Sequence, residues 1–552
     1  MSSTTGTATL RDGTLPIDAP LAVDPATVRW ALECDVLVIG FGAAGASAAI
    51  AARKAGARVI VADRFDGGGA SAKSGGIVYA GGGTQQQKAH GYDDTPEEMF
   101  KYLRLETGDA VSEPTLRQFC EDSRGLIEWL ESIGADFTST APPPKTSYPK
   151  DGIYLYYSGN ESVAEYAEQA RPAPRGHRTR GTWLSGKTMF EFLRAETTRQ
   201  GAQVLTQTSA RRLITDAKTG AVIGAELWQL PPGSDAARRH DKLILKAEKV
   251  FNVFPKWATR LRAEARDLEL AHAIPLQVRA ARGVILSTGG FIFNREMVAR
   301  HAPKYTRTMS LGTAGCDGSG IRLGQSVGGH ADKLDHVSAW RFINPPVDWP
   351  KGIAVNQKGE RFCNEQVYGA KLGVEMCEFH DGKAWLVLDR KLRWNAIREA
   401  IFGGLWFFQS VPALLMMLFA KRARTPEALG AKLGIDGAGL GRTVADYNAA
   451  IAEKREDPLR KSDAMRAPLD TPKFYALDIG SHMACPAITL GGLRVDEGNG
   501  AVLNTQGQAI AGLYAAGRTA IGIASNRYVS GLSLADCLWS GRRAGSHAAG
   551  QN

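Results

Sequence analysis

The sequence of 552 residues predicts an α/β fold in which an inserted α+β domain divides a larger Rossmann-like domain into two parts. An apolar strand, an alanine-rich helix and a second apolar strand follow one another over residues 34–62, which is the order of a βαβ unit. Glycine-rich, strand-like sequence returns at residue 474, after a stretch rich in tryptophan, proline and other aromatic residues. We therefore expect an extension over 1–30, a main domain over 31–333 and 474–552, and an inserted catalytic or capping domain over 334–473.

The elements of the main domain follow from short-range patterns. Runs of β-branched and aliphatic residues predict buried strands, and longer periodic segments predict helices. The expected strands are 34–39, 57–62, 204–208, 210–215, 221–228 and 281–287. The expected helices are 40–56, 95–106, 112–133 and 533–548. Residues 1–30 are expected to form a loose extension, and the polar segment 231–269 an insertion.

Composition restricts the classes of function. Glycine contributes 62 residues, about 11% of the chain against a usual ~7%, without the triplet period of collagen. The formal charge of +10 fits an anionic ligand or a lipid surface better than nucleic acid, which we do not expect as a partner. The seven cysteines form no C-x-x-C pair, so we expect no metal site. The first thirty residues show no secretory signal, and we expect a cytoplasmic protein.

A dinucleotide-binding fingerprint lies at the first turn. The sequence Gly40-Phe41-Gly42-Ala43-Ala44-Gly45 follows the first strand and opens the first helix, and Asp63 ends the second strand. Glycines at these positions permit a tight turn, close approach of a pyrophosphate and close helix packing, while the acid accepts from a ribose hydroxyl. The helix N-terminus adds unpaired N–H groups that favour an anion. These features together predict a bound dinucleotide.

Two further segments distinguish FAD from NAD. A second glycine- and serine-rich loop covers residues 67–76, and the sequence Gly512-Leu513-Tyr514-Ala515-Ala516-Gly517-Arg518 precedes the last helix. With the first motif, they resemble the flavoprotein family of fumarate reductase, succinate dehydrogenase and the 3-ketosteroid dehydrogenases over residues 34–548. The resemblance implies an extended FAD, held without a covalent bond because the 67–76 loop contains no histidine.

The resemblance also implies a set of cofactor-binding residues. The set includes the loop 71–76 near the ribityl chain and Ala210 near the adenine. It also includes Ser533 and Leu534 near the flavin pyrimidine. Arg518 stands where the family commonly has an acidic residue. The full set is Gly40, Gly42, Ala43, Ala44, Gly45, Asp63, Arg64, Gly69, Ser71, Ala72, Ser74, Gly75, Gly76, Ala210, Thr288, Gly289, Gly290, Asp317, Gly318, Gly517, Arg518, Ser533 and Leu534.

The substrate motifs depart from those of the fumarate reductases. In that branch an arginine follows the R-F-x-N-E segment, whereas here Tyr368 stands near that position. The segment before Gly491-Gly492-Leu493-Arg494 contains no histidine, although fumarate reductases carry histidines there. A dicarboxylate needs fixed positive charge and several donors. The departure therefore argues against succinate and fumarate as substrates.

The C-terminal segment instead resembles the 3-ketosteroid Δ4-(5α)-dehydrogenases. The sequence Asn526-Arg527-Tyr528-Val529-Ser530-Gly531 matches their active-site segment, and Tyr368 resembles their middle-domain tyrosine. The Δ1-dehydrogenases carry a Y-P-G-P-G-like segment where this chain has Y-V-S-G. The resemblance implies C4–C5 dehydrogenation of a 5α-3-ketosteroid. A Δ1-dehydrogenase or another flavin C=C oxidoreductase, and a membrane-associated electron carrier without a substrate of its own, remain as alternatives.

The residue types suit this chemistry. A 3-keto group acidifies C4, so that a base can remove a proton there while C5 passes hydride to flavin N5. A tyrosine hydroxyl polarises the ketone, and a tyrosine base needs a lowered pKa or a relay partner. We expect Tyr368 and Tyr528 to be catalytic, Ser530 to be the relay of Tyr528, and Gly531 to bind substrate. Which tyrosine is the base stays open, and the electron acceptor is unknown.

An uncharged segment raises the question of a membrane. Residues 401–420 contain no Lys, Arg, Asp or Glu and are followed by Lys421, Arg422 and Arg424. The length would just span a bilayer core, but two glycines and Pro412 oppose a spanning helix. A buried helix pair and an interfacial element that admits substrate are the other interpretations. The interfacial one adds a peripheral contact with the inner face of a membrane.

Overall fold

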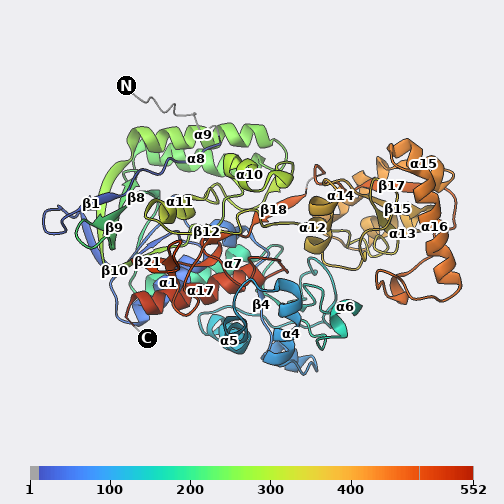
Figure 1. Cartoon of the computed structure of the whole chain (residues 1–552), viewed down its shortest axis with the longest axis horizontal. Coiled ribbons are helices and arrows are strands. Elements are labelled where there is room, and N and C mark those ends of the chain that lie inside the picture. Colours follow the sequence, from blue (N-terminus) through green and yellow to red (C-terminus); the bar gives the residue numbers. More distant parts are fainter. Residues whose placement is uncertain (1–11, 484, 551–552) are drawn as a thin grey trace.

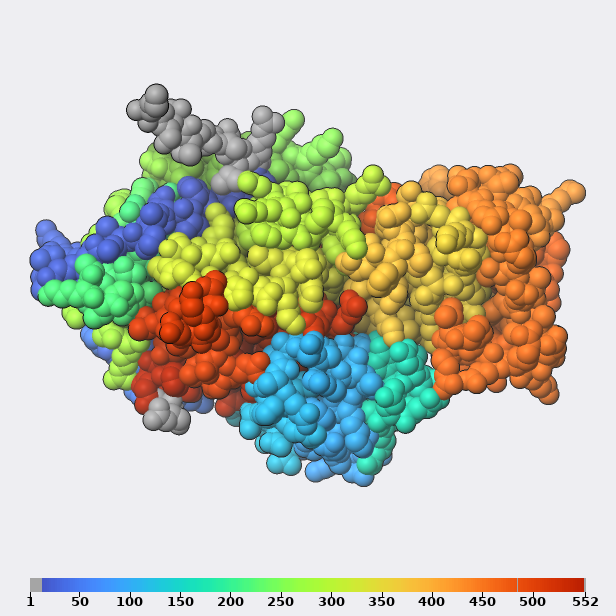
Figure 2. All heavy atoms as spheres, viewed as in Figure 1, coloured from blue at the N-terminus to red at the C-terminus, as the bar shows by residue number. Residues whose placement is uncertain are grey.

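The computed structural model describes residues 12–483 and 485–550. Figure 1 shows a larger main domain with helices around a central sheet, from which the inserted domain projects at one end. The space-filling view of Figure 2 shows the inserted domain, coloured yellow to orange, as a separate lobe. The discontinuous α/β architecture expected from the sequence is confirmed.

The central sheet of the main domain is mixed. Parallel pairs join β10 to β2, β2 to β3 and β3 to β7, whereas β8, β9 and β10 are antiparallel neighbours. Because β2, β3 and β10 are parallel and in register, their carboxyl ends meet at one edge. The strands, in sheet order, are β1 (Leu21–Val23), β8 (Thr208–Asp216), β9 (Val222–Gln229), β10 (Ile274–Leu286), β2 (Leu32–Ile39), β3 (Val59–Ala62) and β7 (Gln203–Leu205), with β21 (Ala509–Ala515) beside β10 and β20 (Ala501–Leu503) beside β21.

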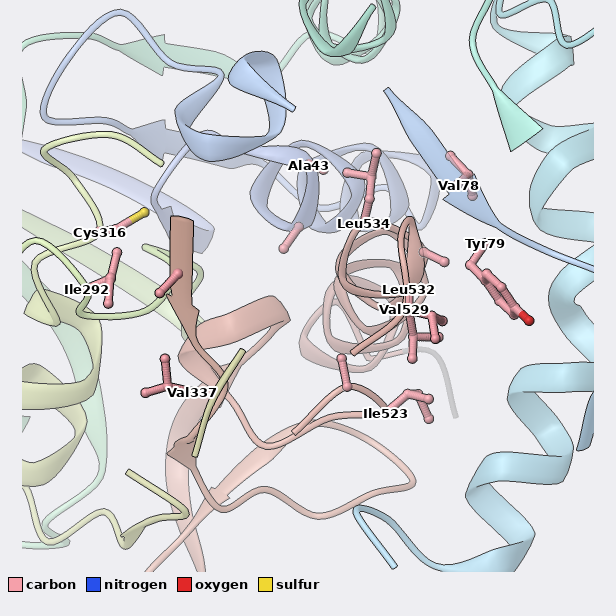
Figure 3. Packing of buried hydrophobic residues seen from close by; sticks show 14 of the residues in the cluster. Ala43, Val78, Tyr79, Ile292, Cys316, Val337, Ile523, Val529, Leu532 and Leu534 are labelled. Carbon is pink, nitrogen blue, oxygen red and sulfur yellow. The ribbon is translucent and has the colours of Figure 1, made fainter. Parts of the chain in front are cut away.

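Two helices from opposite ends of the chain pack against each other over this sheet. They are α1 (Ala43–Lys54) and α17 (Leu532–Ala548). A side chain at Gly541 or Gly545 would collide with the backbone of Ala44 or Ala48, so these glycines permit the close approach. Figure 3 shows Ala43 of α1 and Leu534 near the start of α17 among the buried residues. The first and last segments of the sequence therefore build one site together.

Smaller elements surround this centre. Helices α8 and α9 form a hairpin between β9 and β10, at one side of the main domain (Figure 1). The remaining elements of the main domain are α2 (Gly69–Lys73), β4 (Ile77–Tyr79), α3 (Gln85–Ala89), α4 (Pro96–Thr107), α5 (Glu113–Ser132), β5 (Leu155–Tyr156), α6 (Ala164–Ala167), β6 (Gly176–Arg178), α7 (Gly186–Arg199), α8 (Asp235–Val250), α9 (Pro255–His272), α10 (Arg295–His301), η1 (Pro303–Tyr305), β11 (Met309–Ser310), α11 (Ser319–Ser326), β12 (Ala331–Asp332), β13 (Val337–Ala339), β18 (Pro486–Thr489), β19 (Gly492–Leu493) and η3 (Gly517–Thr519).

The inserted domain has its own antiparallel sheet, in the order β14-β15-β17-β16. Strand β17 was expected to begin the second part of the main domain, but it pairs with β15 and β16, so this sheet reaches past residue 473. The elements are β14 (Ile353–Val355), α12 (Gly369–Phe379), β15 (Trp385–Asp389), α13 (Arg390–Phe402), α14 (Phe407–Leu418), β16 (Lys421–Ala423), α15 (Pro426–Leu433), α16 (Gly437–Ala452), η2 (Asp463–Met465) and β17 (Phe474–Asp478).

The N-terminal extension differs from the expectation. Residues 1–11 lie outside the described part, but from residue 12 the chain packs onto the main domain. Thr14 and Leu15 are buried, and β1 pairs with β8 in parallel. The expected loose segment is therefore wrong for residues 12–30.

The structure of the uncharged segment 401–420 argues against two of its interpretations, the membrane-spanning helix and the buried helix pair. It forms the end of α13 and the short helix α14, which contains Pro412. Within residues 12–483 and 485–550, no helix is both long and apolar enough to cross a bilayer. Nor is the segment a buried pair, because Phe402, Phe407 and Phe419 are 82%, 70% and 79% exposed.

Candidate active site

A long cavity lies at the carboxyl ends of β2, β3 and β10. It runs past the first turn, the end of β3, strand β8 and the loop before α11. Its lining includes Gly40, Gly42, Asp63, Ser71, Ala210, Thr288, Gly289, Asp317 and Arg518. In open α/β sheets, ligands bind in the crevice outside the carboxyl ends of the strands.

The glycines of the first turn have distinct structural roles. Gly40 has φ +104°, and a Cβ there would lie 2.6 Å from the Ser287 carbonyl oxygen. A Cβ at Gly45 would collide with the Gly40 carbonyl, so this glycine permits α1 to approach the turn. At Gly42 a Cβ would meet only Ser71 Oγ, at 3.6 Å, and Gly68 O, at 3.8 Å. The backbone at Gly42 is therefore accessible from the cavity, as a pyrophosphate site requires.

The acid at the end of β3 is held by the backbone. Asp63 accepts hydrogen bonds from the N–H groups of Phe41 and Phe65, each at 2.8 Å. Burial raises the pKa of Asp63, while these backbone donors oppose the increase. The next residue, Arg64, pairs with Glu269 at 2.9 Å and with Asp317 at 3.2 Å. Its guanidinium therefore fixes the cavity wall rather than standing free for a ligand.

The cavity contains a cationic donor suited to an anionic ligand. Within the described chain, Arg518 Nη1 is buried without a hydrogen-bond partner, and Arg518 lines the cavity. A buried unpaired guanidinium donor is costly unless a ligand satisfies it. The acid on β3, the accessible turn at Gly42 and this donor fit the ribose, pyrophosphate and flavin end of an extended FAD.

A second cavity adjoins the first and shares Ala70, Ser71, Lys73, Arg518 and Cys537 with it. Most of its remaining wall is aromatic or aliphatic, with hydroxyl groups at a few positions. These residues are Ile77, Tyr148, Leu184, Leu311, Trp340, Ile488, Tyr528, Ser530, Gly531, Ser533 and Leu534. The only cationic residues on its wall, among the described residues, are the shared Lys73 and Arg518.

Tyr528 lines this second cavity, and Tyr368 belongs to the buried cluster that packs against Tyr528. The Trp340 and Tyr528 rings lie 5.1 Å apart, and Phe342 contacts Tyr368 at 5.9 Å between ring centroids. The Gly531 N–H donates to Tyr528 Oη at 3.4 Å. Ser530 lies beside Tyr368 and Tyr156 and influences the pKa of both. The structure thus places Ser530 beside Tyr368 and gives Tyr528 a backbone donor instead of the expected serine relay.

Burial dominates the electrostatics of these hydroxyls. It raises the pKa of Tyr368 well above its ordinary value, and the Ser530 hydroxyl opposes this increase. It also raises the pKa of Tyr528, against the Gly531 N–H, and that of Tyr148 to about 12. All these side chains are neutral at pH 7, so each is a hydrogen-bond donor at rest and acts as a base only after its own proton leaves.

Comparison with known proteins supports this geometry. The FAD binding domain family matches residues 35–534. A 3-oxo-5-alpha-steroid 4-dehydrogenase of Comamonas testosteroni is 44% identical over 502 residues, which are 89% of this chain and 93% of that protein. The crystal structure of 3-ketosteroid-delta4-(5alpha)-dehydrogenase from Rhodococcus jostii RHA1, in complex with 4-androstene-3,17-dione, has a TM-score of 0.80 and 31% identity, and covers 97% of this chain and all of that one. The chain belongs to the FAD-binding flavoproteins, in the branch of the 3-ketosteroid Δ4-(5α)-dehydrogenases.

Flavoproteins with lower sequence identity to this chain share its fold. A fumarate reductase (cytochrome) of Shewanella frigidimarina is 26% identical over 97% of this chain and 81% of that protein. A 3-ketosteroid delta1-dehydrogenase structure from Sterolibacterium denitrificans has a TM-score of 0.66 at 21% identity, over 94% and 99% of the two chains. Both branches named by the sequence analysis are thus related, and the Δ4-(5α) branch has the higher identity.

The flavoprotein places its expected cofactor residues in two groups. Those on the walls of the two cavities are Gly40, Gly42, Asp63, Arg64, Gly69, Ser71, Ala72, Ser74, Gly75, Ala210, Thr288, Gly289, Asp317, Arg518, Ser533 and Leu534. The others lie behind the walls, where they permit close packing or begin α1: Ala43, Ala44, Gly45, Gly76, Gly290, Gly318 and Gly517. Tyr368 lies on neither wall but lines a neighbouring cavity beneath the inserted domain.

Two lining residues of the flavoprotein escaped the sequence analysis. Tyr148 lies in the loop between α5 and α6, and Trp340 follows β13. The density of tyrosine and proline over 141–159 was a usable signal. No sequence pattern indicated Trp340, because only folding brings it close to Tyr528.

Two residues with reactive side chains have structural roles in the flavoprotein. His177 is buried and contacts Thr84 Oγ at 2.9 Å. Burial lowers its pKa to about 4, so the ring is neutral. Cys363 is buried, and burial raises its pKa well above the ordinary value. Neither residue supplies charge to the candidate site.

Proposed function

We propose that this flavoprotein dehydrogenates a 5α-3-ketosteroid at C4–C5. The observation that carries the proposal is the composition of the second cavity. Its aromatic and aliphatic walls suit an apolar polycyclic substrate, and its hydroxyls suit a single ketone. Lys73 and Arg518 also face the cofactor cavity, so fixed cations for two carboxylates are not concentrated around the substrate. The 44% identity to the Comamonas enzyme supports the same reaction.

The roles of the side chains follow from their hydrogen bonds. Tyr528 takes the C4 proton, because it lines the second cavity and the Gly531 N–H stabilises its phenolate. Tyr368 and Ser530 act at the ketone, since burial keeps the Tyr368 hydroxyl protonated and a neutral tyrosine donates to a developing enolate oxygen. Trp340 and Tyr148 orient the rings of the substrate by contact. Bound FAD supplies the oxidant that accepts the C5 hydride.

A substrate comparison tests the proposal. The purified holoenzyme is incubated with an artificial electron acceptor and either a 5α-3-ketosteroid or succinate. We expect a conjugated enone that absorbs in the ultraviolet from the steroid and no turnover of succinate. Succinate oxidation, or a 1-ene as the sole steroid product, would contradict the proposed reaction and favour one of the alternatives.

The exposed apolar segment 401–420 bears on how the enzyme meets its apolar substrate. We assign a peripheral membrane contact to the apolar tip, defined as Ile401, Phe402, Phe407, Leu415, Leu418 and Phe419, all highly exposed. Lys421 and Arg422 follow it and are also exposed. Exposed apolar side chains with adjoining cations suit the surface of an anionic bilayer.

The apolar tip adjoins the substrate cavity through one aromatic contact. The rings of Phe408 on α14 and Tyr148 lie 6.1 Å apart, and Tyr148 lines the second cavity. A steroid that enters at α14 would therefore meet Phe408 and Tyr148 before it reaches the cavity.

Sedimentation with vesicles tests the contact. We expect the enzyme to sediment with vesicles that contain phosphatidylserine, and the double variant Phe402→Ser/Phe419→Ser to remain in the supernatant. Activity on a water-dispersed steroid should be unchanged in this variant, because both side chains lie outside the cavity. Equal sedimentation of the two proteins would overturn the assignment.

A further inference from the structure

The hairpin of α8 and α9 is longer than the connection between its flanking strands requires. Strands β9 and β10 are antiparallel neighbours, and Gln229 pairs directly with Ile274. Two residues suffice to join such strands, yet residues 230–273 lie between them. The sequence analysis identified most of this segment only as an insertion. Its position in the fold indicates what it covers.

One face of α8 forms part of the wall of the cofactor cavity. Asp241, Ile244, Leu245 and Glu248 line it together with Asp63 and Ala210. Their spacing of three, four and seven residues is that of neighbours on one helix face. Leu245 is 51% exposed although it lines a cavity. This face thus presents an aliphatic pair between two carboxylates.

Buried contacts fix the first half of α8 beside the end of β3. His240 Nε2 lies 3.1 Å from Glu269 Oε1 of α9, and Glu269 also pairs with Arg64. The His240 ring stacks on Phe65 at 5.9 Å, with an interplanar angle of 10°. The Gln207 side chain donates to the Ala237 carbonyl at 2.9 Å. All these partners adjoin Asp63 or Ala210, so α8 is anchored at the end of the cavity where the fingerprint acid lies.

The second half of α8 reaches the opposite side of the same cavity. Glu248 pairs with Lys73 of α2 at 2.7 Å, and both residues line the cavity. Lys73 is 51% and Glu248 26% exposed, so water weakens this pair. The second half of α8 also packs on α9 through the buried residues Ala247, Ala258 and Leu261. The ion pair with Lys73 is its contact across the cavity.

We propose that α8 is a cofactor-binding element that covers the adenosine half of FAD. The acid on β3 binds the adenosine ribose in this fold, and Ile244 and Leu245 pack against the adenosine from the other side. The ion pair between Lys73 and Glu248 closes the cover. The inference rests on FAD binding and is independent of the steroid reaction. A covered adenosine explains how the protein retains FAD without a covalent bond.

Release of FAD tests the cover without recourse to turnover. The holoenzyme is diluted into buffer with an excess of a flavin-binding trap, and the recovery of flavin fluorescence gives the release rate. We expect the double variant Ile244→Ala/Leu245→Ala to release FAD about tenfold faster or more, because apolar contacts with the cofactor are lost. Leu270→Ala is the matched control, since Leu270 is an exposed leucine of α9 outside the cavity, and it should release FAD at the parental rate.

A charge exchange tests the closing ion pair separately. We expect Glu248→Lys to speed release several-fold, and Lys73→Glu/Glu248→Lys to restore it toward the parental rate. The melting temperature of each apoprotein is measured alongside. The proposal would be overturned if the Ile244→Ala/Leu245→Ala variant released FAD at the parental rate. It would also be overturned if faster release were accompanied by a lower melting temperature of the apoprotein. Faster release with unchanged apoprotein stability supports it.

Discussion

Tyr528 carries the chemical hypothesis at the scale of single residues. Its hydroxyl accepts a hydrogen bond from the Gly531 N–H, and Tyr528 shares the cavity wall with Ser533 and Leu534. Burial nevertheless raises its pKa, so only a small fraction is phenolate at neutral pH. The proposed base is therefore present mostly in its inactive protonation state.

This protonation state makes the reaction dependent on pH. We expect kcat/KM to rise with pH from neutrality to at least pH 10, because the phenolate fraction increases until the pH reaches a pKa that lies above the ordinary value. Phe substitution at Tyr528 should remove this rise and reduce kcat by about 10²–10⁴-fold. Tyr368→Phe should reduce kcat, whereas kcat/KM should still rise with pH. If Tyr368→Phe alone removes the rise, the roles of the two tyrosines are exchanged.

A second residue, Glu106, links titration to stability. Burial raises its pKa to about 7. The native state therefore holds a proton that the unfolded chain has lost between about pH 4.5 and 7, and stability falls as the pH rises through this window. Glu106→Gln should remove a penalty on the order of 3 kcal/mol at pH 7 and almost none at pH 4.5. Chemical denaturation of both proteins across this range measures the difference, and a constant difference would contradict the assignment.

At the scale of elements, the packing of α17 on α1 organises the site. The helix α17 begins with Ser533 and Leu534, which line the second cavity, and its glycines lie against the backbone of α1. Any side chain at Gly545 must push the helices apart. The position of the cofactor loop and that of the substrate segment therefore depend on one interface.

Gly545→Val should thus lower the free energy of unfolding by about 1–3 kcal/mol, the usual cost of overpacking. FAD should also bind more weakly, since the turn at Gly42 moves with α1. The control is Ser546→Val, which places the same β-branched residue at the next position, where the side chain is half-buried. Equal melting temperatures for the two variants would contradict the packing argument.

The elements also show which parts of the fold could be predicted. Strands 34–39 and 57–62 and the last helix were found close to their observed bounds, because buried parallel strands are short apolar runs and the last helix is periodic. The sheet of the inserted domain was misassigned at β17, because its partners β15 and β16 are distant in sequence. The segment 401–420 looked apolar enough to be buried, but composition does not distinguish an apolar face that packs from one that remains exposed.

The site was predictable to the extent that it depends on backbone. The glycine motif and its acid have spacing fixed by the turn and strand, and most of the expected cofactor residues lie on the cavity walls. Tyr148, Trp340 and the face of α8 are brought to the cavities by tertiary packing alone.

At the scale of the whole molecule, a hydrogen-bonded chain joins the two domains at the site. Asn160 of the main domain accepts from the Tyr368 N–H at 2.6 Å and donates to Glu106 at 2.6 Å. Tyr368 precedes α12, and its N–H is one of several contacts between the inserted domain and the main domain, together with the Lys371–Glu165 ion pair. The position of one proposed catalytic tyrosine thus depends on contact between domains.

Replacing Asn160 tests this link. Asn160→Ala leaves a buried N–H unpaired, which costs about 1–3 kcal/mol, and we expect a lower kcat with unchanged affinity for FAD. Asn160→Asp keeps the acceptor for Tyr368 but faces Glu106, so its activity should recover as the pH falls and Glu106 becomes protonated. Parental kcat in Asn160→Ala would show that the tyrosine is positioned by other contacts.

The central claim, C4–C5 dehydrogenation by the bound flavin, is tested most directly in a single anaerobic turnover. The oxidised holoenzyme is mixed with one equivalent of a 5α-3-ketosteroid, the flavin absorbance is followed, and the steroid is then identified. The account predicts bleaching of the flavin with formation of an equal amount of the 4-ene-3-ketone. An unbleached flavin, or bleaching that yields the 1-ene, would contradict it.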